Sequence, residues 1–342
     1  MRKGKNPNNN TSKTYVGFIH QVVIPVYIPN EIGYFKDGLK VLKASLQSLL
    51  KTSHEKTFIT IVNNGSFYKV TDYLNILFLE GLVHEIIHTS NIGKVNAVMK
   101  SVKGHYFKVI TIADADTFFL SNWQNEVVNV FNTFPKAGVV GMVPQFKLYD
   151  YLCANVLFDY ALSKKMRFTE VVNPEAMKHF YKSIGWDDNY NQDFLKVNLT
   201  LQSKQGLRAI VGSGHFVATY RSETFMNSPS YEIKELLGSK SDRDFLDYPI
   251  LKKGGYRLTT EDNYAYHMGN VYEGWMEEVL IKLSKPKEIL EVDLKPVSSS
   301  KSSYFIKNHL FRKLTENKNF INAFIKFKGL PQDMTKTPWH DW

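Results

Sequence analysis

Two aspartates separated by one residue follow a short apolar run, and this spacing suits metal binding. The run VITIA at residues 109–113 predicts a buried strand, and Asp114 and Asp116 come directly after it. On extended chain, side chains at positions i and i+2 lie on the same side, so both carboxylates could share one hard cation such as Mg²⁺ or Mn²⁺. In an open α/β sheet, ligands bind outside the carboxyl ends of the strands, where this pair would lie. The alternative is a pair of turn aspartates, which is disfavoured because the next helix has its own candidate cap in Ser121 or Asn122.

Strand and helix patterns alternate along the first part of the chain. Continuous apolar runs predict strands, and leucines or other apolar residues at helical spacing predict the helices between them. The expected strands are residues 20–27, 58–62, 83–88, 109–113 and 138–143. The expected helices are residues 39–50, 70–80, 123–134, 151–165 and 175–183, and residues 91–99 are expected to be a loop that runs into a further helix. This alternation predicts a mostly parallel sheet with helices on both faces.

Composition limits the partners and the compartment. The chain has 342 residues, a formal net charge of +10 and a pI near 9.3, which suits a phosphate-bearing substrate, an anionic membrane surface or a nucleic acid. Its single cysteine, Cys153, excludes an internal disulfide framework and indicates a reducing compartment. No run reaches the roughly 18 to 20 apolar residues of a membrane span, and the first residues lack the apolar core of a signal peptide. We therefore expect a cytoplasmic protein.

Four segments, taken in order, resemble the motifs of glycosyltransferase family 2. They are VVIPVY at residues 22–27, VNNGS at 62–66, NIGKVNA at 91–97 and ADAD at 113–116. The resemblance covers about residues 20–145 and is looser afterwards. It implies the GT-A fold, an α/β fold with a Rossmann-like, mostly parallel sheet, and a nucleotide-activated sugar as substrate.

The chain is expected to divide into four regions. Composition indicates a flexible basic tail, and the resemblance implies two halves of a GT-A domain, the first for the nucleotide sugar and the second for the acceptor and catalysis. A helical extension follows. The regions are 1–14 (tail), 15–145 (nucleotide-sugar half), 146–270 (acceptor and catalytic half) and 271–342 (extension).

The resemblance also implies roles for donor-site residues. Pro25 and Tyr27 would line the base and ribose pocket, and Asn64 would stand where the family usually has an aspartate that reads the base. Asp114 would face the ribose or the metal. Asp116 would bind the cation that bridges the diphosphate, because a divalent ion neutralises the charge that develops on the departing nucleoside diphosphate.

Two glycine-containing segments are further candidates for contact with the donor. Gly93 allows close approach of the backbone, and Lys94 near a helix start could meet phosphate; the alternative is an asparagine-capped helix with a surface lysine. Gly212, Ser213 and Gly214 lie between two strand-like runs and resemble the family's segment beneath the donor sugar. The alternative there is a bulge or a hairpin turn.

An acidic segment in the second half resembles the part of the family that supplies the catalytic base. Counting back from the Gly-Tyr pair at residues 255–256 places Asp244 at the base position, with Asp242 and Asp247 as alternatives. A carboxylate there would deprotonate the acceptor hydroxyl opposite the leaving group, and direct displacement would then invert the anomeric centre. A helix-capping role is also open, because Ser241 and Asp244 have capping-box spacing.

His267 and Trp186 complete the candidate residues. In several GT-A enzymes a histidine at a late position joins the aspartates on the metal, and imidazole is an acceptable ligand for Mn²⁺, so His267 is a candidate ligand; the alternative is a core histidine. Trp186 lies beside carboxylates and could stack on an acceptor or donor sugar, or it could be a half-buried packing residue.

The C-terminal part is basic and amphipathic. Residues 304–327 carry apolar side chains at helical spacing among Lys and Arg. This segment could lie on an anionic membrane where lipid-linked acceptors are found, pack on the catalytic core, or pack on a second subunit of a homo-oligomer. The first possibility would place the protein peripherally at the inner face of the membrane.

Together these observations predict a metal-dependent, inverting glycosyltransferase. It would use Mn²⁺ or Mg²⁺ and move a sugar from a nucleotide diphosphate, expected to be UDP, to a hydroxyl of a glycan or glycolipid precursor in polysaccharide biosynthesis. A non-catalytic sugar-nucleotide or glycan-binding protein is the first alternative, because Asn63 and Arg243 depart from the family pattern. A sugar-phosphate nucleotidyltransferase would need a glycine-rich loop that residues 25–29 lack, and no motif supports specific binding of nucleic acid.

Overall fold

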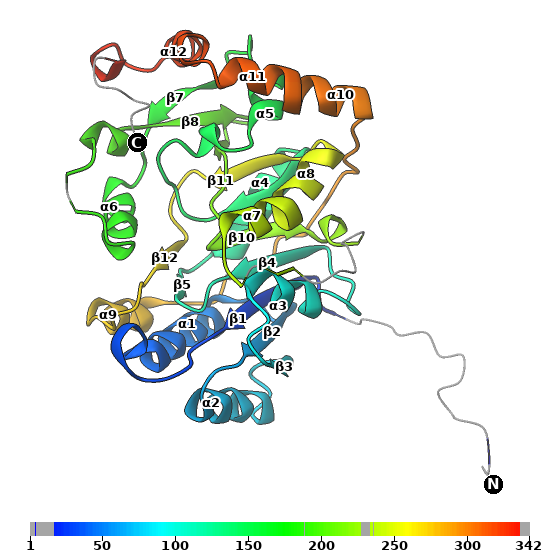
Figure 1. The fold of residues 1–342 in the computed structure, drawn as a ribbon, viewed down its shortest axis with the longest axis vertical. Helices are drawn as coiled ribbons and strands as arrows, with labels where there is room; N and C mark the ends of the chain where they lie inside the picture. Colours follow the sequence, from blue (N-terminus) through cyan, green and yellow to red (C-terminus); the bar gives the residue numbers. More distant parts are fainter. Residues whose placement is uncertain (1–3, 5–16, 188, 227–232, 235, 336–342) are drawn as a thin grey trace.

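The protein is built on a ten-stranded sheet. The computed structural model describes residues 4, 17–187, 189–226, 233, 234 and 236–335, so most of the expected tail over residues 1–14 lies outside the described residues. The strand order is β3-β2-β1-β4-β10-β6-β11-β9-β8-β7 (Figure 1). The strands are β1 His20–Val26, β2 Thr57–Asn64, β3 Glu85–Thr89, β4 Val109–Ala113, β6 Ala137–Gly141, β7 Met166–Glu170, β8 Val197–Gln202, β9 Arg208–Val211, β10 Val217–Arg221 and β11 Tyr256–Thr260.

Strand directions confirm the expected mostly parallel α/β fold. β3, β2, β1 and β4 are parallel to one another, β10 is inserted antiparallel between β4 and β6, and β11 is parallel to β6. β9, β8 and β7 then alternate in direction. Only β10, β9 and β7 among the strands of this sheet in the described residues therefore run against β1. A second, two-stranded sheet pairs β5 (Thr117–Phe119) with β12 (Ala265–His267).

Helices cover both faces of the sheet, and the longer ones pack on it through an apolar stripe at helical spacing. In α1, for example, Leu42, Leu46 and Leu49 are fully buried at spacings of four and three residues. The helices are α1 Gly38–Thr52, α2 Tyr68–Leu79, α3 Lys94–Ser101, α4 Trp123–Thr133, α5 Ala154–Asp159, α6 Pro174–Ser183, α7 Ser239–Asp242, α8 Tyr248–Lys253, α9 Trp275–Lys282, α10 Lys301–Phe305, α11 Arg312–Thr315 and α12 Lys318–Phe327. Two π-helical turns, Arg243–Asp247 and Ile306–Phe311, join α7 to α8 and α10 to α11.

One predicted helix is much shorter than expected. The prediction covered residues 151–165, whereas α5 ends at Asp159 and β7 begins at Met166. The reason is a contact that is remote in sequence, because the Lys328 ammonium donates to the carbonyls of Tyr160 and Ser163 at 2.8 and 2.9 Å. These carbonyls are thereby held in a turn.

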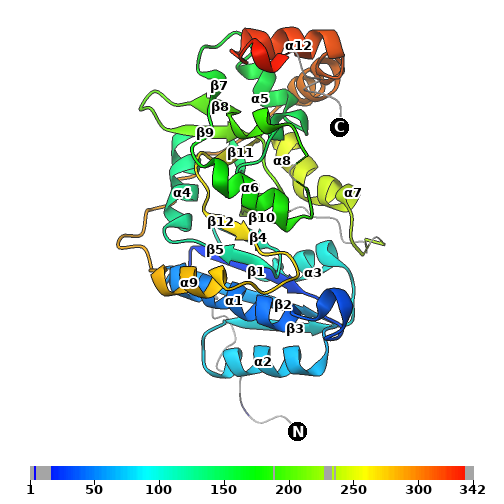
Figure 2. The same cartoon turned by 90° about the vertical axis from the view of Figure 1, so that its left-hand side faces the viewer.

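The C-terminal region crosses the molecule before it becomes helical. After α9, residues 283–300 form an extended segment. Side chains of the domain donate hydrogen bonds to its backbone carbonyls: Asn125 to Glu288 and Arg221 to Lys295. α10, α11 and α12 then cap one end of the long axis (Figures 1 and 2). The predicted helical extension is therefore helical in two separate parts. Within the described residues, no helix combines the length and apolarity needed to cross a bilayer.

Candidate active site

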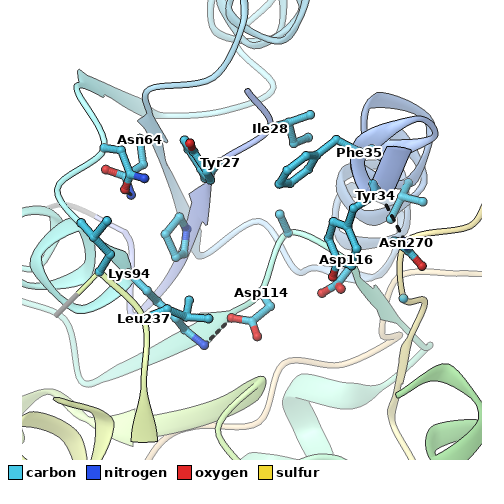
Figure 3. Close-up of a pocket in the computed structure, with 17 residues that line it drawn as sticks. Tyr27, Ile28, Tyr34, Phe35, Asn64, Lys94, Asp114, Asp116, Leu237 and Asn270 are labelled. Atoms are coloured by element: carbon cyan, nitrogen blue, oxygen red, sulfur yellow. Dashed lines mark hydrogen bonds and ion pairs between the residues drawn. The ribbon is translucent and has the colours of Figure 1, made fainter. Parts of the chain in front are cut away.

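A cavity of about 580 Å³ opens at the carboxyl ends of β1, β2 and β4. Its polar lining includes Asn64, Asp114 and Asp116 from these strand ends and Lys94 from the start of α3 (Figure 3). Apolar and aromatic side chains form the rest of the wall, including Pro25, Tyr27, Ile28, Tyr34, Phe35, Val41, Leu236 and Leu237. Pro25, Tyr27, Asn64, Lys94, Asp114 and Asp116, all expected from the sequence, line this cavity. Gly93, which directly precedes Lys94, and the segment with Gly212, Ser213 and Gly214 do not.

Asn64 positions the loop at the start of α3. Its Oδ1 accepts a hydrogen bond from the Ile92 amide at 2.9 Å, and its Nδ2 donates to Asn91 Oδ1 at 3.3 Å. The same Asn91 oxygen accepts from the Gly93 amide. Gly93 occupies the cap position of α3 with a φ of 83°, a conformation that glycine adopts without steric cost. Asn64 thus holds the loop that delivers Lys94 to the cavity.

Lys94 forms an ion pair with Asp114. The Lys94 side chain is only 15% exposed, so the alternative of a surface lysine is wrong. Burial by itself would lower the pKa of Lys94, but the carboxylates of Asp114, Asp242 and Asp116 outweigh it and raise the pKa. The cavity therefore holds the Lys94 ammonium as one half of an ion pair with Asp114, and an ammonium is a suitable contact for a phosphate group.

Asp114 and Asp116 point in different directions. The Thr117 amide donates to the Asp114 carbonyl at 3.1 Å, so the two aspartates lie in a tight turn between β4 and β5 and not on extended chain. The extended chain that the sequence suggested for this pair is therefore wrong, although both aspartates line the same cavity. Asp114 faces Lys94, and Asp116 faces His267.

The pairing of β12 with β5 brings His267 to Asp116. His267 lies opposite Thr117 in this pairing, and its Nε2 is 3.4 Å from Asp116 Oδ2. Its Nδ1 is 2.9 Å from the Ser183 hydroxyl, which orients the ring. Burial raises the pKa of Asp116, although the positive potential of His267 opposes the shift. His267 thus lies beside Asp116, and its role as a metal ligand stays a prediction.

Asp116 and His267 are the two side chains that fit a divalent cation. In the described part of the chain, no three His, Cys, Asp or Glu side chains come close enough to enclose a metal ion, because Lys94 engages Asp114. A carboxylate and an imidazole are acceptable ligands for Mn²⁺, and Mg²⁺ in nucleotide sites also uses few protein ligands together with phosphate oxygens. The donor set therefore fits a cation shared with a bound diphosphate.

Three candidate carboxylates for the base lie on one continuous helix and face different surroundings. Residues two apart on a helix point to different sides, so Asp242 and Asp244 are separated. Asp244 is paired with Arg243 at 2.9 Å and is one-third exposed. Asp242 lies on the helix that begins just after Leu237, and the charges of Lys94 and Asp114 act on it. Ser241 donates to the Gly238 carbonyl and does not form the capping box with Asp244.

Asp242 has the environment of a potential base. Burial raises its pKa, and the charges of Lys94 and His215 oppose the shift. Its Oδ1 is buried and has no hydrogen-bond partner among the described residues. A carboxylate with a spare acceptor next to the donor cavity could accept a proton from an incoming hydroxyl.

Asp247 is a structural group. It is 1% exposed and lies between Arg257, whose Nη1 is 2.7 Å from Oδ1, and His215, whose Nε2 is 2.8 Å from Oδ2. Arg257 is equally buried, donates to the Ser213 carbonyl and lies over the Tyr151 ring at 4.9 Å. Both carboxylate oxygens are therefore occupied. Sequence reasoning missed Arg257 and His215, because they lie far from Asp247 in the chain.

The segment with Gly212, Ser213 and Gly214 connects two strands, β9 and β10, that are not neighbours in the sheet. β9 and β10 flank it but do not pair with each other, so the hairpin alternative is wrong. Gly212 has a φ of 109°, and a Cβ there would collide with the Leu148 carbonyl. The Gly212 and Ser213 carbonyls accept hydrogen bonds from Thr259 and Arg257. The glycines thus serve close chain packing, and these residues do not line the cavity.

Trp186 packs in an aromatic cluster. Its ring stacks on Tyr181 with centroids 5.2 Å apart and also contacts Phe146 and Tyr190 at 5.5 and 5.9 Å. These contacts favour the alternative of a half-buried packing residue, and stacking on a sugar stays a prediction.

We expect Trp186→Ala to lower the free energy of unfolding by about 2–3 kcal/mol, because it removes part of this cluster. Urea denaturation measures the change, and nucleotide binding should be unaltered. Trp186→Phe is the control and should retain most of the stability. Unchanged stability combined with a raised KM for the acceptor would show that the indole contacts substrate.

Part of the chain matches the model of a known protein family. Residues 21–183 match the model of Glycosyl transferase family 2. No curated protein matches the chain. This match and the observed sheet agree with the α/β, GT-A fold predicted from the sequence.

Solved structures with some similarity are glycosyltransferases, with TM-scores from 0.41 to 0.43. S. aureus TarS 1–349 is 14% identical at a TM-score of 0.41, over 77% of this chain and 69% of that one. GalNAc-T7 with UDP, GalNAc and Mn²⁺ is 13% identical at a TM-score of 0.43, and the match covers 94% of this chain and 53% of that one. The mannosyltransferase PcManGT from Pyrobaculum calidifontis, in complex with GDP-Man and Mn²⁺, is 11% identical at 0.41, over 90% and 72%.

Proposed function

We propose that the protein is a glycosyltransferase that transfers a sugar from a UDP-sugar to a hydroxyl of a glycan or glycolipid precursor, with UDP as the leaving group. The match of residues 21–183 to Glycosyl transferase family 2 supports this class of reaction. The observation that carries the proposal is the convergence of Asn64, Lys94, Asp114 and Asp116 on one cavity beside aromatic side chains. Aromatic rings and amides suit a nucleoside, and the buried ammonium suits its diphosphate.

Each residue of the site has a distinct task in this proposal. Tyr27 and Pro25 hold the base and ribose, while Asn64 keeps the loop in place that presents Lys94 to the diphosphate. Asp116 and His267 would hold Mn²⁺ or Mg²⁺. A divalent ion there neutralises charge on the departing diphosphate when it is bound.

Asp242 is the proposed base. It replaces Asp244 in this role because its carboxylate interacts with Lys94 and Asp114, whereas Asp244 is paired with Arg243. An acceptor hydroxyl would donate its proton to the carboxylate of Asp242 as its oxygen attacks the anomeric carbon. Attack opposite the leaving group inverts that centre.

The non-catalytic alternative loses its two supporting observations. Asn63 donates to Thr71 and accepts from the Ser66 amide, so it stabilises the end of β2 and is not a cavity residue. Arg243 pairs with the neighbouring Asp244. Their departures from the family pattern therefore leave the cavity and Asp242 intact.

Calorimetric titration with UDP, in the presence and absence of Mn²⁺, tests the proposal. We expect UDP to bind with Mn²⁺ more tightly than GDP or CDP. Asp116→Asn should weaken the Mn²⁺-dependent binding by at least the roughly 100-fold that follows loss of a group supporting a metal.

Asp72→Asn is the matched control, since it removes an exposed carboxylate on α2, and it should bind UDP as the wild type does. Absence of nucleotide binding by the wild type under all these conditions would contradict the donor site. Binding of UDP without turnover of any UDP-sugar would instead support the non-catalytic alternative.

A further inference from the structure

The C-terminal helices expose an apolar row at one end of the molecule. α10, the π-helical turn and α11 form one continuous helix over residues 301–315. Ile306, Leu310 and Leu314 follow one another at four-residue spacing on this helix and are 45%, 49% and 51% exposed. Asn308 and Phe311, on the other side, are buried against the domain. One side of the helix therefore packs against the domain, whereas the side with the apolar row is exposed.

Two further exposed apolar side chains lie next to the C-terminal helices. Phe327 at the end of α12 is 66% exposed, and Leu162 in the turn after α5 is 89% exposed. The hydrogen bonds from Lys328 to the carbonyls of Tyr160 and Ser163 bring this turn next to the end of α12. Exposed apolar side chains thus come from three segments at the same end of the protein.

The same segment carries most of the excess positive charge of the chain. Residues 301–328 contain seven Lys or Arg side chains and one acidic side chain, Glu316, so their net charge is +6 against +10 for the whole chain. His309 and Lys313 are exposed beside the apolar row, and Lys301 and Lys326 are exposed as well. Apolar residues flanked by basic ones on an exposed helix face suit an anionic lipid interface.

We propose that this end of the protein docks on the surface of an anionic lipid bilayer. The apolar row would enter the headgroup region while the lysines contact anionic headgroups. A symmetric pairing of two copies through this face would bring the exposed lysines of both copies together, among them Lys301, Lys313 and Lys326, which repulsion disfavours. Nucleic acid would contact the basic side chains but would leave the apolar row unused.

Docking in this way leaves the donor cavity accessible. α10, α11 and α12 lie at one end of the long axis, whereas the cavity is formed by β1, β4 and the start of α1 in the other half (Figures 1 and 2). This inference goes beyond the proposed function, because it concerns a separate surface and does not depend on the identity of the donor.

Flotation with vesicles tests the inference on the full chain. The vesicles contain phosphatidylcholine alone or with about one third phosphatidylglycerol. We expect the protein to float only with the anionic vesicles. The triple variant Ile306→Ser, Leu310→Ser, Leu314→Ser should reduce the partition coefficient roughly tenfold or more. Lys301→Gln, Lys313→Gln, Lys326→Gln should reduce it as well, and salt should weaken the wild-type binding.

A matched control keeps the test specific. Ile76→Ser, Leu79→Ser, Ile281→Ser removes apolar residues that are 51%, 83% and 81% exposed on α2 and α9, and it should float like the wild type. Circular dichroism and UDP titration of each variant verify that it is folded.

Three results would overturn the inference. The first is equal flotation of the wild type and the Ile306, Leu310, Leu314 variant, or no flotation of either. The second is a dimeric mass in solution that this variant alone reduces to a monomer, which would assign the face to self-association. The third is binding of a short DNA duplex, without vesicle binding, that the lysine variant abolishes.

Discussion

Asp242→Asn is expected to reduce turnover by about 10²–10⁴-fold, the usual contribution of a general base. The substitution keeps the size of the side chain but removes the acceptor that takes the proton of the attacking hydroxyl. UDP binding should be retained, because Asp242 does not line the donor cavity. Steady-state transfer assays and UDP titration of the same preparation measure both quantities.

Asp244→Asn is the matched control for this experiment. It makes the same change two residues away on the same helix, in a carboxylate that is paired with Arg243 and one-third exposed. We expect it to retain most of the activity. Loss of activity in Asp244→Asn together with retention in Asp242→Asn would reverse the assignment.

The pH profile gives an independent test of Asp242. Burial raises its pKa, so the ionised, proton-accepting form appears only at a higher pH than for an ordinary aspartate. We therefore expect kcat/KM to increase with pH through a limb that lies above the usual range of aspartate, and this limb should be absent in Asp242→Asn. A limb at the usual aspartate range would contradict the role of this carboxylate.

Asp247→Asn is expected to lower the free energy of unfolding by about 3–5 kcal/mol, the usual effect of removing one partner of a buried ion pair. Arg257 is 1% exposed, and without the charge of Asp247 its guanidinium would be buried without a counter-ion. Urea denaturation followed by circular dichroism measures the change.

Two further variants separate this effect from a general response to substitution. Asp244→Asn removes the exposed pair with Arg243 and should cost no more than about 1 kcal/mol. Combining Asp247→Asn with Arg257→Gln should cost less than the sum of the single variants, because the double variant leaves no unpaired charge. Additive effects would show that the two side chains do not stabilise each other.

Local sequence patterns located most of the donor site. The strand before Asp114 was predicted with the bounds that it has, Val109–Ala113, because a fully buried strand is a continuous apolar run. The residues expected to contact the nucleotide follow the strand ends and therefore meet at one edge of the sheet. The family resemblance was confirmed over residues 21–183.

Counting along the chain left the base open among Asp242, Asp244 and Asp247. Residues Arg243–Asp247 form a π-helical turn, which changes which side chains share a face, and the choice of Asp242 therefore depends on the fold and stays a proposal. The burial of Asp247 also could not be predicted, since its partners Arg257 and His215 come from other elements.

The sequence by itself determined the main strands and helices of the first part of the chain, the resemblance to the enzyme family and the positions at which polar residues leave the strands. These depend on hydrophobic periodicity and on short motifs, which are local. The tertiary structure alone decided how Asp114 and Asp116 divide between Lys94 and His267. It also decided which side of the C-terminal helix stays exposed. Both depend on which distant segments meet, because a side chain's charge partner and burial are set by neighbours in space.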